Sequence, residues 1–342
     1  MEFVPVLSQK EVYSKFKFYM KILYHLGYPR TGSTYLQTNI FPEHKDINLI
    51  GPKNSKNWSD VKISQEELNS ISSRFFDIEI NDKQKILSEK KYLKFFDQSK
   101  LNVISSEKYA SYLNIRNNFR DIKFFNKLLQ ENHKETKVFF LIVLRNQYDL
   151  IKSHYHHGYS LYSESLGIHD FRKLIECFEK NLNSREMFQF LLYADSFNFF
   201  RLYNSLVENF KNHSLKFLFY EDFKLNKDFF VREFSQFLDL DEDYTKKLFS
   251  DEVVNKLKKE NDVIKYSSKL REKVTQNYLV KKIKNFIPKN IKDYLVKNTL
   301  SKIRISPNEE EEYRKIIRNY YKESNEKFFT NVKLINKYNR LY

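Results

Sequence analysis

The apolar pattern of the chain alternates between strand-like runs and helix-like stretches. Strand-like runs occupy residues 16–27, 101–107, 137–145 and 215–223, and the third of them is apolar almost without interruption, as in parallel sheets. Helical spacing marks stretches between them, including 119–133 and 188–210. This alternation predicts an α/β fold in which a parallel sheet is flanked by helices.

The pattern changes near residue 251. From there onward strand signals fade, the chain is strongly basic, and apolar residues recur at helical spacing with breaks at Pro288 and Pro307. Ser306 as N-cap, Pro307 in the first position and acidic residues in the first turn predict a terminal helix. We therefore expect an α/β core over residues 1–250 and a basic helical C-terminal region over 251–342 that packs on or extends the core.

The chain is strongly basic as a whole. It carries 60 Lys and Arg against 44 Asp and Glu, a formal net charge of +16. Such an excess suits an anionic partner, which can be a nucleotide, a nucleic acid, an anionic glycan or a membrane surface. Compositional drift explains the excess equally well, since Lys, Asn, Phe and Tyr are plentiful and Gly is scarce.

The sequence gives no sign of export or of membrane insertion. The longest clean apolar run, residues 138–144, is far shorter than a membrane span. Lysines interrupt the N-terminal stretch where a signal peptide needs apolar residues, and the single cysteine, Cys177, excludes an internal disulfide. We therefore expect a cytoplasmic protein.

A loop after the first predicted strand has the form of an anion-binding turn. It reads Gly27-Tyr28-Pro29-Arg30-Thr31-Gly32-Ser33-Thr34 and leads into a predicted helix. Backbone N–H groups and the positive end of a helix dipole hold phosphate or sulfate in such loops. A magnesium–ATP enzyme would have lysine after the second glycine, where this chain has Ser33, and an acidic strand end nearby. The loop therefore favours another anion, although an ordinary Gly-rich turn is also compatible with it.

A second candidate segment follows the third predicted strand. Arg145 stands at the carboxyl end of that strand and Ser153 follows eight residues later, with Asn146 and Asp149 suited to starting a helix between them. The carboxyl edge of a parallel sheet is where α/β proteins bind ligands. A guanidinium fork and a hydroxyl can hold a second phosphate there, unless Arg145 pairs with an acidic residue and Ser153 faces solvent.

Together the two segments resemble the sulfotransferases that use 3′-phosphoadenosine-5′-phosphosulfate (PAPS). The resemblance covers roughly residues 20–240 and includes "FLFYEDF" at 217–223, while "YKESNEKF" at 321–328 is similar to a helix end in bacterial members. It implies a nucleotide-kinase-like fold in which the 5′-phosphosulfate and the 3′-phosphate of PAPS have separate binding segments. The implied 5′-phosphosulfate ligands are Arg30, Thr31, Gly32, Ser33, Thr34 and Tyr35, and the implied 3′-phosphate ligands are Arg145 and Ser153.

The chain departs from the family pattern in three places. Arg30 replaces a lysine of the hormone-type enzymes, and Gln147 replaces a common proline. Those enzymes use a histidine after the second strand to accept the hydroxyl proton, whereas this chain offers Glu107 and Lys108. Glycan-directed relatives commonly use a glutamate, so the resemblance implies Glu107 as general base and Arg30 and Lys108 as electrostatic support for the sulfuryl group. An ion pair between Glu107 and Lys108 at the surface is the alternative.

The predicted reaction is sulfuryl transfer from PAPS, with no metal, to a hydroxyl of a carbohydrate such as a surface polysaccharide or a glycolipid. His154, His156 and His157 crowd together, but no carboxylate completes an obvious zinc set. The basic C-terminal region could contact an anionic glycan or membrane, which would place the protein at the inner membrane face. The alternatives are a kinase of the same fold and a basic nucleic-acid-binding protein, but the latter leaves the paired segments unexplained.

Overall fold

The computed structural model describes most of the sheet and the helices that surround it. Its described residues are 19–28, 30–50, 96–106, 135–157, 166–168, 170–180, 188–210, 213–249, 263–267 and 300–333, with isolated positions between 119 and 130. These residues form two compact units. The first lies within residues 1–144 and 206–254, and the second lies within residues 145–205 and 255–342.

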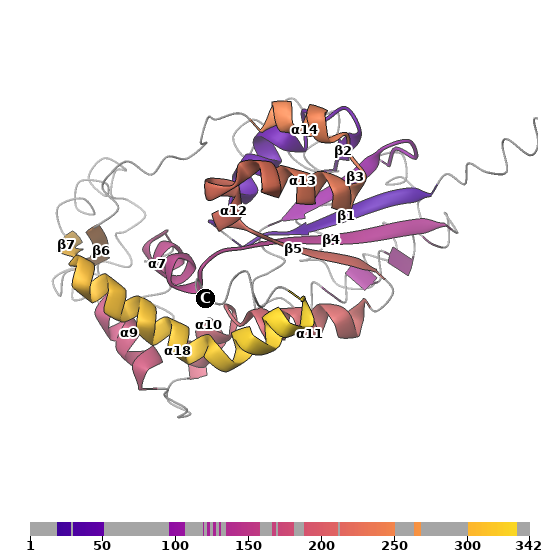
Figure 1. The fold of residues 1–342 in the computed structure, drawn as a ribbon. Coiled ribbons are helices and arrows are strands. Elements are labelled where there is room, and N and C mark those ends of the chain that lie inside the picture. Colours follow the sequence, from indigo (N-terminus) through magenta and orange to yellow (C-terminus); the bar gives the residue numbers. More distant parts are fainter. Residues whose placement is uncertain are drawn as a thin grey trace, which may run out of the picture. The chain divides into compact units, whose positions relative to one another are not determined.

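A five-stranded parallel sheet is the centre of the first unit (Figure 1). Its strands are β1 (Met20–Leu26), β2 (Ile47–Leu49), β3 (Leu101–Ser106), β4 (Thr136–Leu144) and β5 (Ser214–Phe219). The order across the sheet is β2-β3-β1-β4-β5, and every neighbouring pair is parallel. The predicted parallel α/β sheet is confirmed, and β2 is an additional short strand at its edge.

Both faces of the sheet are buried, which explains the uninterrupted apolar run of its central strand β4 from Val138 to Leu144. One face packs against α2 (Ser33–Tyr35), the π-helical turn η1 (Leu36–Ile40) and α13 (Lys227–Leu238). On the other face, the rings of Tyr24 and Phe140 stack at 5.4 Å and Phe210 lies 4.5 Å from Phe140. Successive side chains of a strand point to opposite faces of the sheet, so one apolar run contributes to the apolar layers on both faces.

The strand β5 ends one turn earlier than the sequence pattern indicates. Tyr220, Glu221 and Asp222 do not extend the strand but begin the helix α12 (Tyr220–Leu225). Two acidic residues in the first turn suit the positive end of a helix. In Figure 1, α12, α13 and α14 (Glu242–Leu248) lie together over the sheet.

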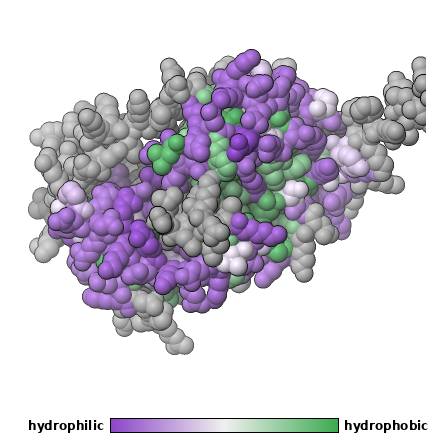
Figure 2. All heavy atoms as spheres, viewed as in Figure 1, coloured by the Kyte–Doolittle hydropathy of each residue, from purple (hydrophilic) through white to green (hydrophobic). Residues whose placement is uncertain are grey.

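The second unit is mainly helical. It contains α7 (Gln147–His157), α9 (Phe171–Glu179), α10 (Phe188–Asp195), most of α11 (Phe199–Asn209) and the long α18 (Pro307–Asn331). A stripe of buried residues recurs about every four positions along α18, as expected for one face of a helix. Its members are Tyr313, Ile317, Tyr321, Asn325, Phe328 and Phe329. Hydrophilic residues cover α9 and α18 on the face that Figure 2 draws.

The start of α18 follows the sequence prediction closely. The backbone N–H of Glu309 donates to Ser306 Oγ at 3.2 Å, and that of Ser306 donates to Glu309 Oε2 at 2.8 Å. Pro307 occupies the first turn, so this helix begins with a complete capping box.

The C-terminal region also contains strands that the sequence pattern does not indicate. The strands β6 (Val263–Ser267) and β7 (Leu300–Arg304) form an antiparallel pair. The expectation of fading strand signals after residue 251 is therefore wrong for these two segments. The predicted boundary at residue 250 stays a prediction. In the part of the chain that the structure describes, no helix has the length and apolar character to cross a membrane.

Candidate functional site

The anion-binding loop follows β1, which lies between β3 and β4 at the centre of the sheet. The chain passes from β1 to β2 and β3 on one side and then to β4 and β5 on the other. Parallel α/β sheets bind ligands beyond the carboxyl edge at such a reversal of strand order. Leu26 at the end of β1 pairs with Ser106, so β1 and β3 finish at the same level. The sequence-predicted loop therefore leaves the sheet where this class of fold forms its binding site.

Two residues of the loop have positive φ angles. Gly32, which precedes α2, has φ 87° and ψ 5°, and Arg30 has φ 74°. Glycine adopts this conformation freely, but an L-residue in the left-handed helical region is strained by about 1–2 kcal/mol. Turns of this kind direct successive backbone N–H groups into a concave anion site, and the first N–H groups of the following helix lack intrahelical partners. The positive φ angles of Arg30 and Gly32 are compatible with the anion-binding turn that the sequence predicts.

Hydroxyl groups inside the loop hold this shape. Thr31 Oγ1 donates to the carbonyl oxygen of Tyr28 at 2.7 Å, and Ser33 Oγ donates to the same oxygen at 3.2 Å. Thr31 and Ser33 are each only 1% exposed. Both side chains therefore stabilise the turn itself, whereas Thr34 is partly buried and has a more accessible side chain.

The two ends of the loop approach each other without room for another side chain. A Cβ atom placed on Gly27 would lie 2.3 Å from Ser33 Oγ and 3.1 Å from Ser33 Cβ. Such distances are below an ordinary van der Waals contact, so a side chain at this position would have to displace Ser33. Gly27 thus allows the close packing against Ser33, whereas Gly32 allows a positive φ angle.

A buried polar network lies beneath the loop. His25 Nδ1 is 2.7 Å from Ser105 Oγ, and Gln37 Nε2 donates to the same oxygen at 2.9 Å. His25 is fully buried, and this burial lowers its pKa to about 3, so the ring is neutral at physiological pH. The network connects β1, β3 and η1 at the carboxyl edge of the sheet.

Sequence reasoning does not find this network. A histidine inside an apolar strand, two residues before Gly27, is the one local signal for it. Ser105 and Gln37 are distant in sequence from His25 and look like ordinary polar residues. Within the described residues, His25 Nε2 has no hydrogen-bond partner.

The second candidate segment belongs to the second unit, whereas the loop belongs to the first. Arg145 directly follows β4 in the chain, and Asn146 Oδ1 accepts hydrogen bonds from the backbone N–H groups of Tyr148 at 3.1 Å and Asp149 at 3.4 Å. Asn146 therefore caps α7, as its sequence position indicates. Ser153 lies on α7 and is partly buried, as is Arg145.

The sequence-predicted base and its neighbour, Glu107 and Lys108, lie outside the described residues. They follow Ser106, the last residue of β3, directly in the chain. Over the residues that the structure does describe, no group of three or more His, Cys, Asp and Glu side chains is arranged to hold a metal ion.

A comparison with protein families finds one that matches most of the chain. A family model described as a sulfotransferase domain matches residues 24–325, from within β1 to within α18. No relative is found among the curated proteins.

Solved structures with the same description share a low sequence identity with this chain. A sulfotransferase from Alicyclobacillus acidocaldarius is 18% identical, with a TM-score of 0.39 over 65% of this chain and 81% of that one. The sulfotransferase domain from the curacin biosynthetic pathway is 14% identical, with a TM-score of 0.33 over 68% and 78% of the two chains. The sulfotransferase domain from the Synechococcus PCC 7002 olefin synthase gives the same four values.

The tight packing of the loop can be tested through stability. We expect Gly27→Ala to destabilise the protein by roughly 1–3 kcal/mol, because the added methyl group overpacks the contact with Ser33. Adding Ser33→Ala removes the oxygen at 2.3 Å and should restore part of this loss. Urea unfolding of the single and double variants measures both effects. If Gly27→Ala costs as much in the Ser33→Ala background as in the wild type, the oxygen of Ser33 is not the obstacle.

The buried imidazole of His25 predicts a pH dependence of stability. Its pKa is about 3 in the folded protein, against about 6.5 for a histidine in an unfolded chain, so between these values the unfolded chain binds more protons. The contribution of neutral His25 to the free energy of unfolding is therefore complete above pH 6.5. It is lost as the pH falls toward 3, by up to about 1.4 kcal/mol per pH unit.

The variant His25→Asn keeps a polar group near Ser105 but does not titrate. We expect its free energy of unfolding to fall less steeply between pH 6 and 4.5 than that of the wild type. Burial lowers the pKa of His44 and His213 as well, so the difference between the two proteins isolates His25. Equal slopes for the two proteins would contradict the assignment.

Proposed function

This chain belongs to the sulfotransferase domain family, and we propose that the acceptor hydroxyl of its reaction belongs to a carbohydrate. The family is PAPS-dependent, so the chain is an enzyme that transfers the sulfuryl group of PAPS to a hydroxyl acceptor. We propose three further aspects of its function, which are the carbohydrate acceptor, the individual site residues and the cellular location.

The strained backbone of Arg30 is the observation that carries the donor site. An arginine with φ 74° occupies a position where glycine would relieve strain, in a loop that already uses glycine at positions 27 and 32. Strained backbone positions of this kind cluster at active sites and ligand-binding sites. We assign the side chain of Arg30 to the phosphosulfate, where its guanidinium offsets the charge that develops on the bridging oxygen as the sulfur–oxygen bond breaks. Backbone N–H groups of residues 31–35 complete this half of the site.

The other half of the donor site is the segment from Arg145 to Ser153. The guanidinium of Arg145 and the hydroxyl of Ser153 would hold the 3′-phosphate, which distinguishes PAPS from other adenosine nucleotides. Asn146 supports this role because it follows Arg145 directly in the chain and caps the start of α7.

Glu107 would accept the proton of the acceptor hydroxyl while that oxygen forms its bond to sulfur, and Lys108 would stabilise the sulfuryl group. The register of the sheet supports the place of Glu107 near the reaction. Leu26 and Ser106 are paired, so the chain leaves β3 beside the start of the loop, and Glu107 is the next residue.

A carbohydrate acceptor agrees with two features of the chain. The proposed base is a carboxylate, as in glycan-directed relatives, and the net charge of +16 suits an anionic glycan or lipid-linked sugar. The same charge agrees with a cytoplasmic enzyme that contacts the inner membrane face through its basic C-terminal region. Charge complementarity would then bring enzyme and acceptor together before chemistry.

The donor assignment predicts that Arg30→Gly separates stability from activity. Glycine removes about 1–2 kcal/mol of backbone strain and costs about 0.5–1 kcal/mol of chain entropy, so the folded state should be unchanged or slightly stabilised. Turnover with PAPS should fall, while Arg30→Lys should keep part of it because the charge remains. Urea unfolding and steady-state kinetics on the same preparations measure the two quantities. Wild-type turnover in Arg30→Gly would remove Arg30 from the site.

The acceptor can be identified with labelled PAPS and a panel of glycans, glycolipids and small phenols. We expect transfer to glycan hydroxyls, and a decrease in kcat of about 10²–10⁴-fold for Glu107→Gln with unchanged binding of adenosine 3′,5′-bisphosphate. Transfer to phenols alone would rule out the carbohydrate. An unchanged kcat in Glu107→Gln would rule out this residue as the base.

A further inference from the structure

The terminal helix α18 contacts α7 through polar side chains at both ends of the proposed 3′-phosphate segment. At one end, Gln147 bonds to Asn325. At the other end, Lys152 bonds to Glu310, and Asp149 between them bonds to Arg314. All these residues belong to the second unit. All three residues of α7 in these contacts thus lie within the segment from Arg145 to Ser153.

The pair of Gln147 and Asn325 is a reciprocal amide contact in the core. Gln147 Nε2 donates to Asn325 Oδ1 at 3.2 Å, and Asn325 Nδ2 donates to Gln147 Oε1 at 2.7 Å. Gln147 is 2% exposed and Asn325 is 3% exposed, and Gln147 Nε2 also donates to the carbonyl oxygen of Phe197 at 3.0 Å. Burying two amides adds little net stability, but each loses its hydrogen bonds if the helices shift. The pair therefore fixes the register of α7 against α18.

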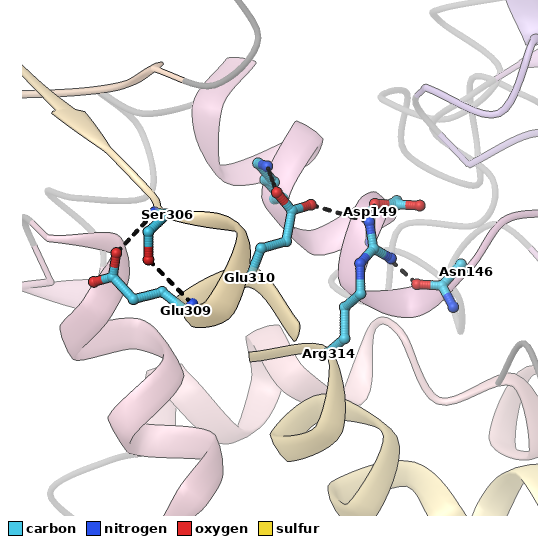
Figure 3. A network of polar contacts seen from close by, with 7 residues as sticks. Asn146, Asp149, Ser306, Glu309, Glu310 and Arg314 are labelled. Atoms are coloured by element: carbon cyan, nitrogen blue, oxygen red, sulfur yellow. Dashed lines mark hydrogen bonds and ion pairs between the residues drawn. The ribbon is translucent and has the colours of Figure 1, made fainter. Parts of the chain in front are cut away.

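The second contact is a charged cluster at the other end of the segment (Figure 3). Arg314 donates to Asp149 at 2.7 Å and to Glu310 at 3.0 Å, and Glu310 accepts from Lys152 at 3.2 Å. The guanidinium of Arg314 also lies 4.6 Å from the centre of the Tyr148 ring. These side chains are less than a third exposed, so the cluster is less screened than a surface ion pair.

The geometry of α7 connects this cluster to Ser153. Residues three and four positions apart lie on the same face of a helix, so Ser153 follows Asp149 on the face that Arg314 contacts. Lys152, which Glu310 holds, is its direct neighbour in the chain. At the other end, Gln147 is two residues from Arg145 and one from the cap residue Asn146. A shift of α7 along α18 would thus move both proposed phosphate ligands together.

Packing alone does not require this arrangement. Rings already join α9 to α18, since Phe178 lies 5.0 Å from Tyr320 and Phe171 lies 6.4 Å from Tyr313. The contacts to α7 differ because they are directional and concentrate on the segment between Arg145 and Ser153.

We propose that α18 is a positioning element for the 3′-phosphate site, acting through Gln147–Asn325 and through Arg314. This inference rests on the proposed roles of Arg145 and Ser153. Two ligands on one segment hold a phosphate well only when their separation and direction are fixed, and small displacements are costly. The helix α18 thereby sets the preference for a nucleotide that carries a 3′-phosphate, without touching it.

The test compares the affinities for adenosine 3′,5′-bisphosphate and adenosine 5′-monophosphate in the full chain. We expect Gln147→Ala and Asn325→Ala each to weaken bisphosphate binding by roughly tenfold, as for residues that orient a ligand-binding group. The monophosphate affinity and kcat at saturating PAPS should change little. The double variant should lose less affinity than the sum of the two single losses, because both substitutions remove the contact between Gln147 and Asn325.

The matched control breaks an ion pair on the same helix that does not involve α7. Arg172 of α9 donates to Glu309 of α18 at 2.8 Å, with side chains 43% and 32% exposed. Arg172→Gln should leave the ratio of the two affinities unchanged. Equal losses of bisphosphate affinity in Arg172→Gln and Asn325→Ala would overturn the proposal, since any loosening of α18 would then suffice.

The partly exposed Arg314 keeps the test decisive if the buried variants do not fold. Arg314→Gln should reduce the ratio of affinities, and Arg314→Lys should restore part of it. An unchanged ratio in Arg314→Gln overturns the proposal.

Failure of the proposed donor site would look different. If the wild type bound both nucleotides equally, or Arg145→Ala kept the wild-type ratio, the roles of Arg145 and Ser153 would be wrong. If Arg145→Ala lost the preference while the α18 variants kept it, the positioning role alone would be wrong.

Discussion

The place of β1 between β3 and β4 is the constraint on which the anion loop depends. Hydrogen bonds to parallel neighbours on both sides fix the direction and level at which the chain leaves the sheet. The turn into α2 then has to be made within a few residues, which leaves no space for a side chain at Gly27 and requires a positive φ at Gly32. Two hydroxyls close the turn onto the carbonyl oxygen of Tyr28. The loop is therefore preorganised by the sheet and by its own side chains, and a ligand need not order it.

The buried network below the loop extends this rigidity to the neighbouring strand. The imidazole of His25 is buried in its neutral form. His25 Nδ1 and Gln37 Nε2 both lie within hydrogen-bond distance of Ser105 Oγ. The proposed base, Glu107, is two residues after Ser105 in the chain. Two polar contacts to Ser105 Oγ thus connect β1, η1 and β3. A site of this kind needs such support because electrostatic stabilisation depends on fixed geometry.

Local patterns in the sequence predict much of the fold. They do not predict very short strands or contacts between residues that are far apart in the chain. The long apolar run of β4, the strand-like patterns of β1 and β3 and the capping residues of α18 are visible in sequence. By contrast, β2 has three residues, too few to show a period, and β6 and β7 lie in basic stretches that hide any alternation. The loop and the Arg145 segment are contiguous motifs and can be read directly. The partners of His25–Ser105 are 80 positions apart and those of Gln147–Asn325 are 178 apart, so only the folded chain shows them.

Gln147 illustrates how a departure from a family pattern is compensated in the fold. Proline would restrict the backbone at the start of α7 through its ring alone, by fixing φ and occupying a position where a free N–H is not needed. Glutamine lacks this restriction, but its buried amide is bonded to Asn325 and to the carbonyl oxygen of Phe197. The restraint is thereby moved from a local ring to a contact between α7, α18 and the turn after α10. A segment held in this way depends on the terminal helix, whereas a proline would have made it independent.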